Sequence, residues 1–400
     1  MNRNLLAIAG ACFIGFSGFT LVMPFLPIYF AQMGMRDPAE IALWSGLSLG
    51  VTPGMTALLA PLWGRLADRY GDKFLVLRSL ACFVLTMVLM GLVTRPWHVF
   101  ALRVLQGFFA GYGALAVSMA AASAPRERMA SAIGTVQTAQ RLGPALGPAI
   151  GGVLAVAIGI RQTFFVSSLF YLAAFVLVWR WFHEAPRAPA PKRKPRAPIF
   201  GDGAALPQFV LLLGVIFALQ LVDRSFGPVL PLFLGSSGWL EHQVALASGL
   251  LFSAGAAAGA AGNLLTQRLL QRWSPRTLLR LTTIVAAIAL VPYVTGAALP
   301  VLLAATVLFG FAIGIATTAS FTAAGHLIPE QSRSTGFSLL TTASLVGLSL
   351  SPIASGVLAR ISIRSVFIVD VISLTVIALV VSYLWQDRIE QASWPPLEET

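Results

Sequence analysis

Two prolines and four glycines inside one apolar run constrain this chain more than any other feature. The run covers residues 143–152 and has the sequence Gly-Pro-Ala-Leu-Gly-Pro-Ala-Ile-Gly-Gly. Gly143, Gly147 and Gly151 recur every four residues, which places them on one helix face and leaves a groove for a neighbouring backbone. Each proline removes a backbone donor and crowds a carbonyl, at a cost of about 3 kcal/mol in a helix interior. The run, which also holds Pro148 and Gly152, therefore predicts a bent helix held by close packing. An ordinary contact between small-residue helices is the alternative.

The composition places this helix in a membrane. Of the 400 residues, 57% are hydrophobic and 10% are charged, and the mean hydropathy is +0.82, which is outside the range of soluble globular chains. Apolar stretches of about twenty residues suffice to cross a hydrocarbon core of roughly 30 Å. We predict an all-α membrane protein with twelve spans, at residues 4–33, 41–63, 74–94, 97–122, 129–158, 162–182, 207–235, 243–267, 277–297, 299–325, 334–358 and 364–385.

The basic residues behind the net charge of +12 concentrate on one side of the predicted membrane rather than in one surface patch. With the N-terminus inside, nineteen Lys and Arg residues fall in inner loops and tails and five in outer loops. This asymmetry predicts that both termini are cytoplasmic and that the excess charge meets anionic inner-leaflet lipid. No aromatic interleaving surrounds the basic residues, so we expect no nucleic-acid partner.

The two halves of the chain repeat each other at an offset of 203 to 204 residues. The segment Pro24-Phe-Leu-Pro27 recurs at 228–231, Val104-Leu-Gln-Gly-Phe at 307–311, and Pro148-Ala-Ile-Gly-Gly at 352–356. Such a duplication predicts two parallel six-helix repeats with a substrate site between them. The expected organisation is an N-terminal half at 1–183, a Pro-rich and basic cytoplasmic linker at 184–206, a C-terminal half at 207–387 and a tail at 388–400.

Three motifs carry a family resemblance that covers nearly the whole chain. The 143–152 run matches G-x-x-x-G-P-x-x-G-G, the antiporter motif that marks helix 5 of exporters in the major facilitator superfamily. The predicted loop between helices 2 and 3, residues 64–73, resembles the family's G-x-L-a-D-r-x-G-r-k signature, except that Asp72 stands where a basic residue is usual. The resemblance implies a cytoplasmic latch against helix 11 near Ser334, and a simple anchoring loop is the alternative. Its residues are Gly64, Asp68, Arg69, Gly71 and Lys73.

Helix 4 carries the third motif, and its first residue is Arg103. The sequence from Arg103 to Gly111 resembles the family's R-x-x-q-G-x-g-a-a pattern. A charged side chain at membrane depth costs at least ~2.5 kcal/mol and needs an interior partner. In the family this arginine is implicated in proton transfer, and we expect it to hold a carboxylate or water in place. A snorkelling arginine is the alternative.

Two acidic residues lie inside predicted spans, Asp223 in helix 7 and Asp370 in helix 12. We predict that Asp223 carries the coupled proton near the kink-forming Pro228, with Asp370 as the second candidate and structural ion pairs as the alternative. Relatives of this type often have an acid in helix 1, whereas residues 4–33 contain none. Further residues predicted to line the cavity are Arg141, Gln137, Gln220, Arg224, Phe19 and Tyr29.

The resemblance implies an exporter of the drug:proton antiporter type, similar to bacterial multidrug and tetracycline efflux proteins, in the inner membrane. The alternatives are an exporter of an endogenous metabolite, such as a sugar or metallophore, and a membrane sensor without flux. The histidines and cysteines are too scattered for a metal site, and no loop is suited to cradle phosphate. We expect a monomer that is not an enzyme, has no cofactor, and binds a small molecule and protons.

Overall fold

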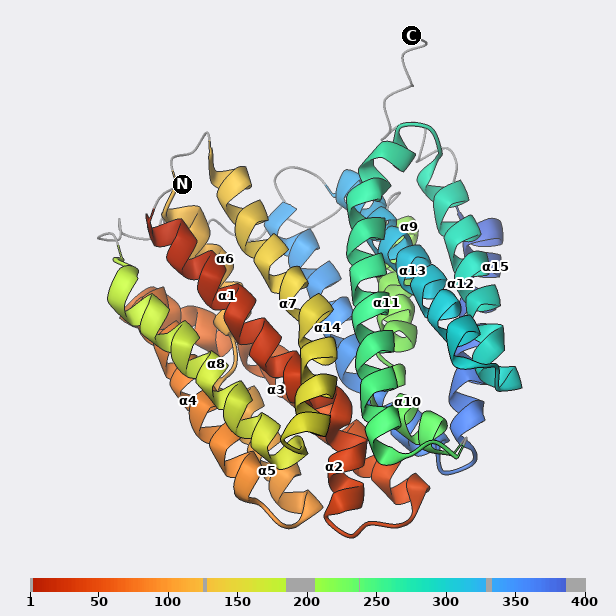
Figure 1. Cartoon of the computed structure of the whole chain (residues 1–400). Coiled ribbons are helices and arrows are strands. Elements are labelled where there is room, and N and C mark those ends of the chain that lie inside the picture. The colour runs from red at the N-terminus through yellow and green to blue at the C-terminus, as the bar shows by residue number, and fades with distance from the viewer. Residues whose placement is uncertain (1–2, 125–127, 185–205, 237, 329–332, 386–400) are drawn as a thin grey trace.

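The computed structural model describes residues 3–124, 128–184, 206–236, 238–328 and 333–385, and every regular element in them is a helix (Figure 1). The first half contains α1 (Arg3–Val22), the 3₁₀ turn η1 (Met23–Phe25), α2 (Leu26–Gln32), α3 (Pro38–Tyr70), α4 (Asp72–Leu92), α5 (Pro96–Phe109), α6 (Tyr112–Ala122), α7 (Met129–Ala157) and α8 (Ile160–Trp181). The second half contains α9 (Leu206–Asp223), α10 (Phe226–Gly235), α11 (Glu241–Leu270), α12 (Pro275–Thr295), α13 (Leu299–Leu327), α14 (Arg333–Leu358) and α15 (Ile363–Leu384).

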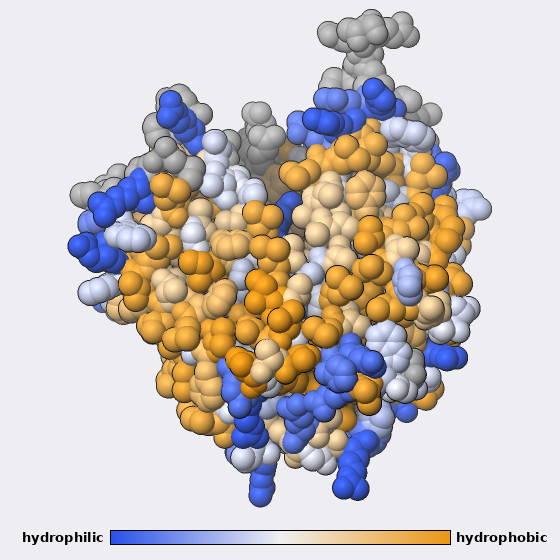
Figure 2. Space-filling model, viewed as in Figure 1, coloured by the Kyte–Doolittle hydropathy of each residue, from blue (hydrophilic) through white to orange (hydrophobic). Residues whose placement is uncertain are grey.

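These helices make the twelve traverses that the sequence predicts. Three traverses are broken: α1 and α2 are joined through η1, α5 and α6 by Ala110 and Gly111, and α9 and α10 by Arg224 and Ser225. In the described residues, eleven stretches are long and apolar enough to span a bilayer. The remaining traverse, α7, is not among them, because its glycines, prolines and polar side chains dilute the apolar ones. Figure 2 shows the hydrophobic surface as a wide band between two hydrophilic ends.

Residues 64–73, which the sequence analysis places in a loop between the second and third spans, are almost entirely helical, and this corrects the prediction. Residues 64–70 continue α3, and α4 begins at Asp72. Gly71 alone makes the turn, with φ +91°, a conformation that glycine adopts without steric cost. The predicted helix 4 is also corrected. It is interrupted at Gly111, which has φ +121°, and no proline near this position predicts the break.

Two bundles stand side by side and meet along two helix pairs. In the first bundle α1 packs on α7 and α3 on α5, and in the second α9 packs on α14 and α11 on α13. Between the bundles, α7 packs on α11 and α3 on α14. Each of these pairs has a counterpart at the repeat offset, so the packing follows the predicted duplication.

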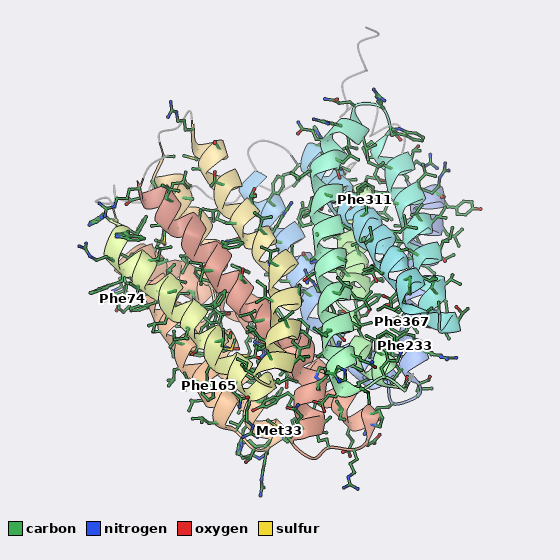
Figure 3. All side chains as sticks on the ribbon, in the orientation of Figure 1. Met33, Phe74, Phe165, Phe233, Phe311 and Phe367 are labelled. Carbon is green, nitrogen blue, oxygen red and sulfur yellow. The ribbon has the colours of Figure 1, made fainter. Side chains whose placement is uncertain are left out.

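The molecule is closed at one end and hollowed at the other. Figure 2 shows a notch between the bundles at the end where α1 begins and α15 finishes, here called the termini end. At the opposite, far end, aromatic clusters fill each bundle. Phe233 and Phe367 lie together (Figure 3), with ring centroids 5.3 Å apart. Tyr29 and Phe164 are 4.9 Å apart in the other bundle.

The predicted linker and tail lie outside the described residues, apart from Glu184 and Leu206 at the linker's edges. The boundaries proposed for the two halves, at 183 and 207, therefore stay predictions.

Candidate functional site

The glycines of the 143–152 run pack α7 against α1, as their four-residue spacing predicts. A β-carbon on Gly143 would lie 2.7 Å from the backbone nitrogen of Ser17. One on Gly147 would meet Thr20, and one on Gly151 would meet the carbonyl of Leu21. A side chain at any of these three positions would therefore push the two backbones apart. Meanwhile α7 continues unbroken through both prolines, and its axis changes direction part-way along (Figure 1).

The other face of the same run contacts the second bundle. A β-carbon on Gly249 of α11 would lie 2.5 Å from the Pro148 carbonyl oxygen, and one on Gly152 would lie 2.9 Å from the carbonyl oxygen of Ala245. The backbone N–H of Ala149 donates to Ser253 Oγ at 2.8 Å. We call this contact between α7 and α11 the first seam.

A second seam repeats this contact between α14 and α3. A β-carbon on Gly46 would collide with the carbonyl of Pro352, and one on Gly356 would lie 2.6 Å from the carbonyl oxygen of Ala42. The Ser349 hydroxyl donates to the carbonyl of Gly50 at 2.8 Å. Because Gly46 precedes Gly249 by 203 residues, the seams are related by the internal repeat. Both lie toward the far end.

Arg141 and Gln137 lie on α7 nearer the termini end, and both side chains are exposed. Arg141 reaches the second bundle at Asn263 of α11. When the amide nitrogen of Asn263 faces the Gly314 carbonyl at 2.7 Å, the amide oxygen accepts from Arg141 Nη1 at 3.2 Å. The contact joins the bundles on the notch side of the first seam.

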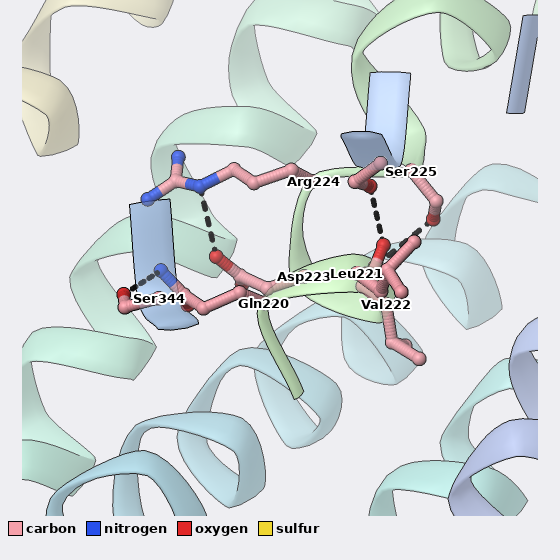
Figure 4. A network of polar contacts seen from close by, with 8 residues as sticks. Gln220, Leu221, Val222, Asp223, Arg224, Ser225 and Ser344 are labelled. Atoms are coloured by element: carbon pink, nitrogen blue, oxygen red, sulfur yellow. Dashed lines mark hydrogen bonds and ion pairs between the residues drawn. The ribbon is translucent and has the colours of Figure 1, made fainter. Parts of the chain in front are cut away.

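Three of the predicted residues meet at the end of α9 (Figure 4). Asp223 Oδ2 lies 3.0 Å from Arg224 Nε, and the two side chains are 27% and 54% exposed. The neighbours therefore form an ion pair, a pairing that the sequence left open. The Gln220 amide donates to Ser344 Oγ of α14 at 2.9 Å.

Asp370 lies apart from this ion pair and is only 5% exposed. Its Oδ2 lies 2.6 Å from the hydroxyl of Ser225, the residue that directly precedes α10. Within the described residues no arginine or lysine pairs with it. The structure thus separates an accessible paired carboxylate, Asp223, from a buried one without a cation.

Arg103 is fully buried in the first bundle. Its Nε donates to the Ser48 carbonyl at 2.9 Å and its Nη1 to Gln106 Oε1 at 2.7 Å, while Gln106 donates to Thr86 Oγ1 at 2.8 Å. Among the residues that the structure describes, the Nη2 group has no hydrogen-bond partner. The interior partners are therefore a carbonyl and an amide, and among the described residues no carboxylate pairs with this guanidinium.

The two aromatic candidates occupy different surroundings. Phe19 is partly buried, and the Arg103 guanidinium lies 5.2 Å from its ring centroid. Tyr29 is 0% exposed, and its hydroxyl donates to the Met90 carbonyl at 2.6 Å. In this conformation Tyr29 packs at the far end and does not line the notch, which corrects that prediction.

The turn between α3 and α4 is anchored within its own bundle. Lys73 Nζ donates to the Phe182 carbonyl at 2.6 Å, which satisfies the end of α8. The Glu184 carboxylate accepts from the Asp72 backbone N–H at 2.9 Å. Asp72, the departure from the family signature, is buried and accepts from Ser118 Oγ at 2.8 Å. An acid suits this position because it opens α4, where the helix dipole favours negative charge.

Among the described side chains, no hydrogen bond or ion pair joins Gly64 or Arg69 to α14, the eleventh traverse. A β-carbon on Gly64 would meet nothing within 4 Å, so this glycine is not needed for close packing in this conformation. Arg69 lies over the Tyr70 ring at 5.3 Å. The side chains of Asp68 and Ser334 lie outside the described set, and the latch stays a prediction.

Several residues at these contacts escaped the sequence reasoning. Gly46, Gly249 and Ser253 form the partner surfaces of the seams, and the 203-residue offset between Gly46 and Gly249 was a usable signal. Ser225 and Asn263 carry no such signal, because their importance depends on which helices the fold brings beside them.

The chain matches a family profile over most of its length. The profile of the Major Facilitator Superfamily matches residues 8–299 and also residues 212–399. Among curated relatives, "Multidrug resistance protein MdtG" of Yersinia enterocolitica is 34% identical over 253 residues, which are 63% of this chain and 61% of the relative. The protein of the same name from Serratia proteamaculans is 32% identical over 292 residues, 73% and 71% of the two chains.

Solved structures share the fold at lower identity. A bacterial homologue of the human lysosomal transporter Spinster has a TM-score of 0.77 with 19% identity, covering 98% of both chains. The nucleoside transporter NupG has a TM-score of 0.75 with 13% identity, covering 96% of this chain and 100% of its own.

Proposed function

Since this chain belongs to the Major Facilitator Superfamily, we propose that it exports small lipophilic or amphiphilic molecules in exchange for protons. One observation carries the proposal. The antiporter run binds α1 through one set of glycines and the opposite bundle through Pro148 and Gly152. A helix with this double role links movement inside one bundle to the contact between bundles, as alternating access requires.

The relatives support the drug-export part of the proposal. Those that match over about 70% of their length carry the name of a multidrug resistance protein. The apolar surface and the helical traverses make the chain a multi-pass membrane protein. We place it in a bacterial inner membrane with both termini cytoplasmic, because its basic residues concentrate on that side. The notch then faces the cytoplasm, from which an exporter loads its substrate.

The accessible polar and charged residues of α7 and of the end of α9 are proposed to meet the substrate. Arg141 and Gln137 are exposed on α7, and the Asp223–Arg224 pair is half-exposed at the end of α9. Asp223 and Asp370 are the proposed carboxyl groups for proton coupling. Arg103 is proposed to hold the centre of the first bundle, where it joins α3, α4 and α5 through Ser48 and Gln106.

Growth under drug stress tests the proposal. A drug-sensitive host that expresses this protein is expected to tolerate higher concentrations of at least one lipophilic compound in a panel of dyes and antibiotics. The control is a Gly249→Val variant at equal membrane abundance, because a side chain there disrupts the first seam. Equal inhibitory concentrations across the panel would contradict multidrug export and would favour a metabolite exporter.

A further inference from the structure

The traverse made by α9 and α10 breaks because Pro228 lacks the backbone N–H that would bond to the carbonyl of Arg224. That carbonyl instead accepts a long bond from the Gly227 N–H at 3.4 Å. Two of the last carbonyls of α9 also accept from serine hydroxyls. Ser351 of α14 donates to the carbonyl of Leu221, and Ser225 lies 2.9 Å from the carbonyl of Val222.

Ser225 also lies 2.6 Å from Asp370 Oδ2, so its hydroxyl faces two acceptors. A hydroxyl has a single hydrogen and can donate fully to one acceptor at a time. If Asp370 is ionised, the Ser225 hydrogen goes to its carboxylate, and the Val222 carbonyl keeps only the longer bond from the Ser225 backbone N–H, at 3.3 Å. If Asp370 is protonated, its own O–H donates to Ser225 Oγ, and the Ser225 hydrogen is free for Val222. Both short contacts are satisfied together only in the protonated form.

The charged and titratable groups around Asp370 are few. On α9 and at the break these are Asp223 and Arg224, which pair with each other. On α12, Tyr293 bonds to Thr306, and the basic residues of that helix lie near its start, toward the termini end. The described side chains of α10 and α14 include no charged group. On α15 itself, Arg364 lies in the first turn.

The break is connected to the second seam through α14. Ser351, which holds the Leu221 carbonyl, directly precedes Pro352, whose carbonyl faces Gly46 of the other bundle. Two residues before Ser351, Ser349 donates to the carbonyl of Gly50. A change in the hydrogen bonds at the end of α9 therefore acts on the part of α14 that closes the far end.

We propose that Asp370 binds the transported proton. Ser225 is the positioning residue that transmits the protonation state of Asp370 to the break between α9 and α10, and so to the second seam. The inference rests on the proposed proton antiport and specifies its site. Asp223 is assigned to the substrate side, because it has a cationic partner and is accessible. Proton binding converts the Asp370 carboxylate to a carboxylic acid. The Ser225 hydroxyl then reorients, so that its hydrogen bond goes to the Val222 carbonyl instead of to Asp370.

The test uses the full-length protein in proteoliposomes with a substrate found in the growth assay. Two quantities are measured across pH: substrate counterflow, which needs no net proton movement, and proton movement driven by a substrate gradient. Asp370→Asn keeps a donor toward Ser225, so counterflow is expected to persist and to lose its pH dependence. Substrate-driven proton movement is expected to be lost.

Ser225 is tested by removing and restoring its hydroxyl. Ser225→Ala is expected to flatten the pH profile of counterflow, and Ser225→Thr, which keeps the hydroxyl, is expected to restore it. The matched control is Ser320→Ala, since Ser320 is equally buried and bonds to the Ala316 carbonyl four residues earlier. The control should keep the wild-type profile.

The outcomes separate the inference from the proposed function. If the wild-type protein moves substrate without moving protons, the antiport itself is wrong. If the wild type moves protons and Asp370→Asn does so equally, Asp370 is not the proton site. If Ser225→Ala keeps the wild-type pH profile, or Ser225→Thr does not restore it, the role given to Ser225 is wrong.

Discussion

The carbonyl oxygen of Pro148 in α7 lies 2.5 Å from the position that a β-carbon on Gly249 of α11 would take. Glycine at position 249 lets the two backbones approach, so main-chain atoms of the two bundles meet directly at this pair. The repeat provides the same arrangement at Pro352 and Gly46. Two of the contacts that close the far end therefore tolerate no added side chain.

Substitution at a seam glycine should change which end of the protein is open. Gly249→Val is expected to force the far end apart, to lower export and to increase the labelling of a cysteine introduced at the far end by a membrane-impermeant thiol reagent. Gly214→Val is the matched control, because a β-carbon there meets nothing within 4 Å. Unchanged labelling and export in Gly249→Val would show that the seam has no such role.

Much of this architecture could be predicted from the sequence, because bilayer thickness and the repeat constrain it strongly. Apolar length predicted the traverses, and the spacing of Gly143, Gly147 and Gly151 predicted a helix contact. The break between α5 and α6 could not be predicted, since Gly111 alone marks it. Nor could the sequence show which carboxyl group is accessible, because the burial of Asp370 depends on how α15 packs against α9 and α12.

The buried guanidinium of Arg103 should be required for stability as well as transport. Arg103→Ala would remove the bond to the Ser48 carbonyl and leave Gln106 Oε1 without its donor, and a buried unsatisfied group costs about 1–3 kcal/mol. We expect a lower melting temperature in detergent and reduced export. Arg103→Lys should restore only part of both, because an ammonium lacks the planar fork that serves two acceptors. A lysine variant with full stability and full export would contradict this account.

The turn at Gly71 should depend on glycine. An alanine at φ +91° and ψ +150°, a region open essentially to glycine alone, costs about 1–3 kcal/mol in strain, and its β-carbon would lie 2.8 Å from Glu184 Oε2. Thermal unfolding in detergent should therefore occur at a lower temperature for Gly71→Ala. For comparison, Gly134→Ala adds a methyl group in α7 where nothing lies within 4 Å, and it should not lower the midpoint. Equal loss of stability in both variants would argue against a special role for the turn.

Asp68→Asn tests the latch that the family resemblance implies. The substitution keeps size but removes the charge that is expected to face the start of α14. Export should fall while membrane abundance is retained, because the latch should no longer hold the termini end closed. Spin labels across that end should report longer distances in the variant. Distances equal to those of the wild type would eliminate the latch.

The central claim is that export is coupled to protons, and substrate-driven proton movement in proteoliposomes tests it most directly. Vesicles that contain the purified protein and a pH-sensitive dye are given an outward or an inward substrate gradient with no initial pH difference. The account predicts that protons move against the direction of the substrate, and that neither the Gly249→Val variant nor protein-free vesicles show this movement. Substrate flux with no accompanying proton movement, or with protons moving in the same direction, would contradict antiport.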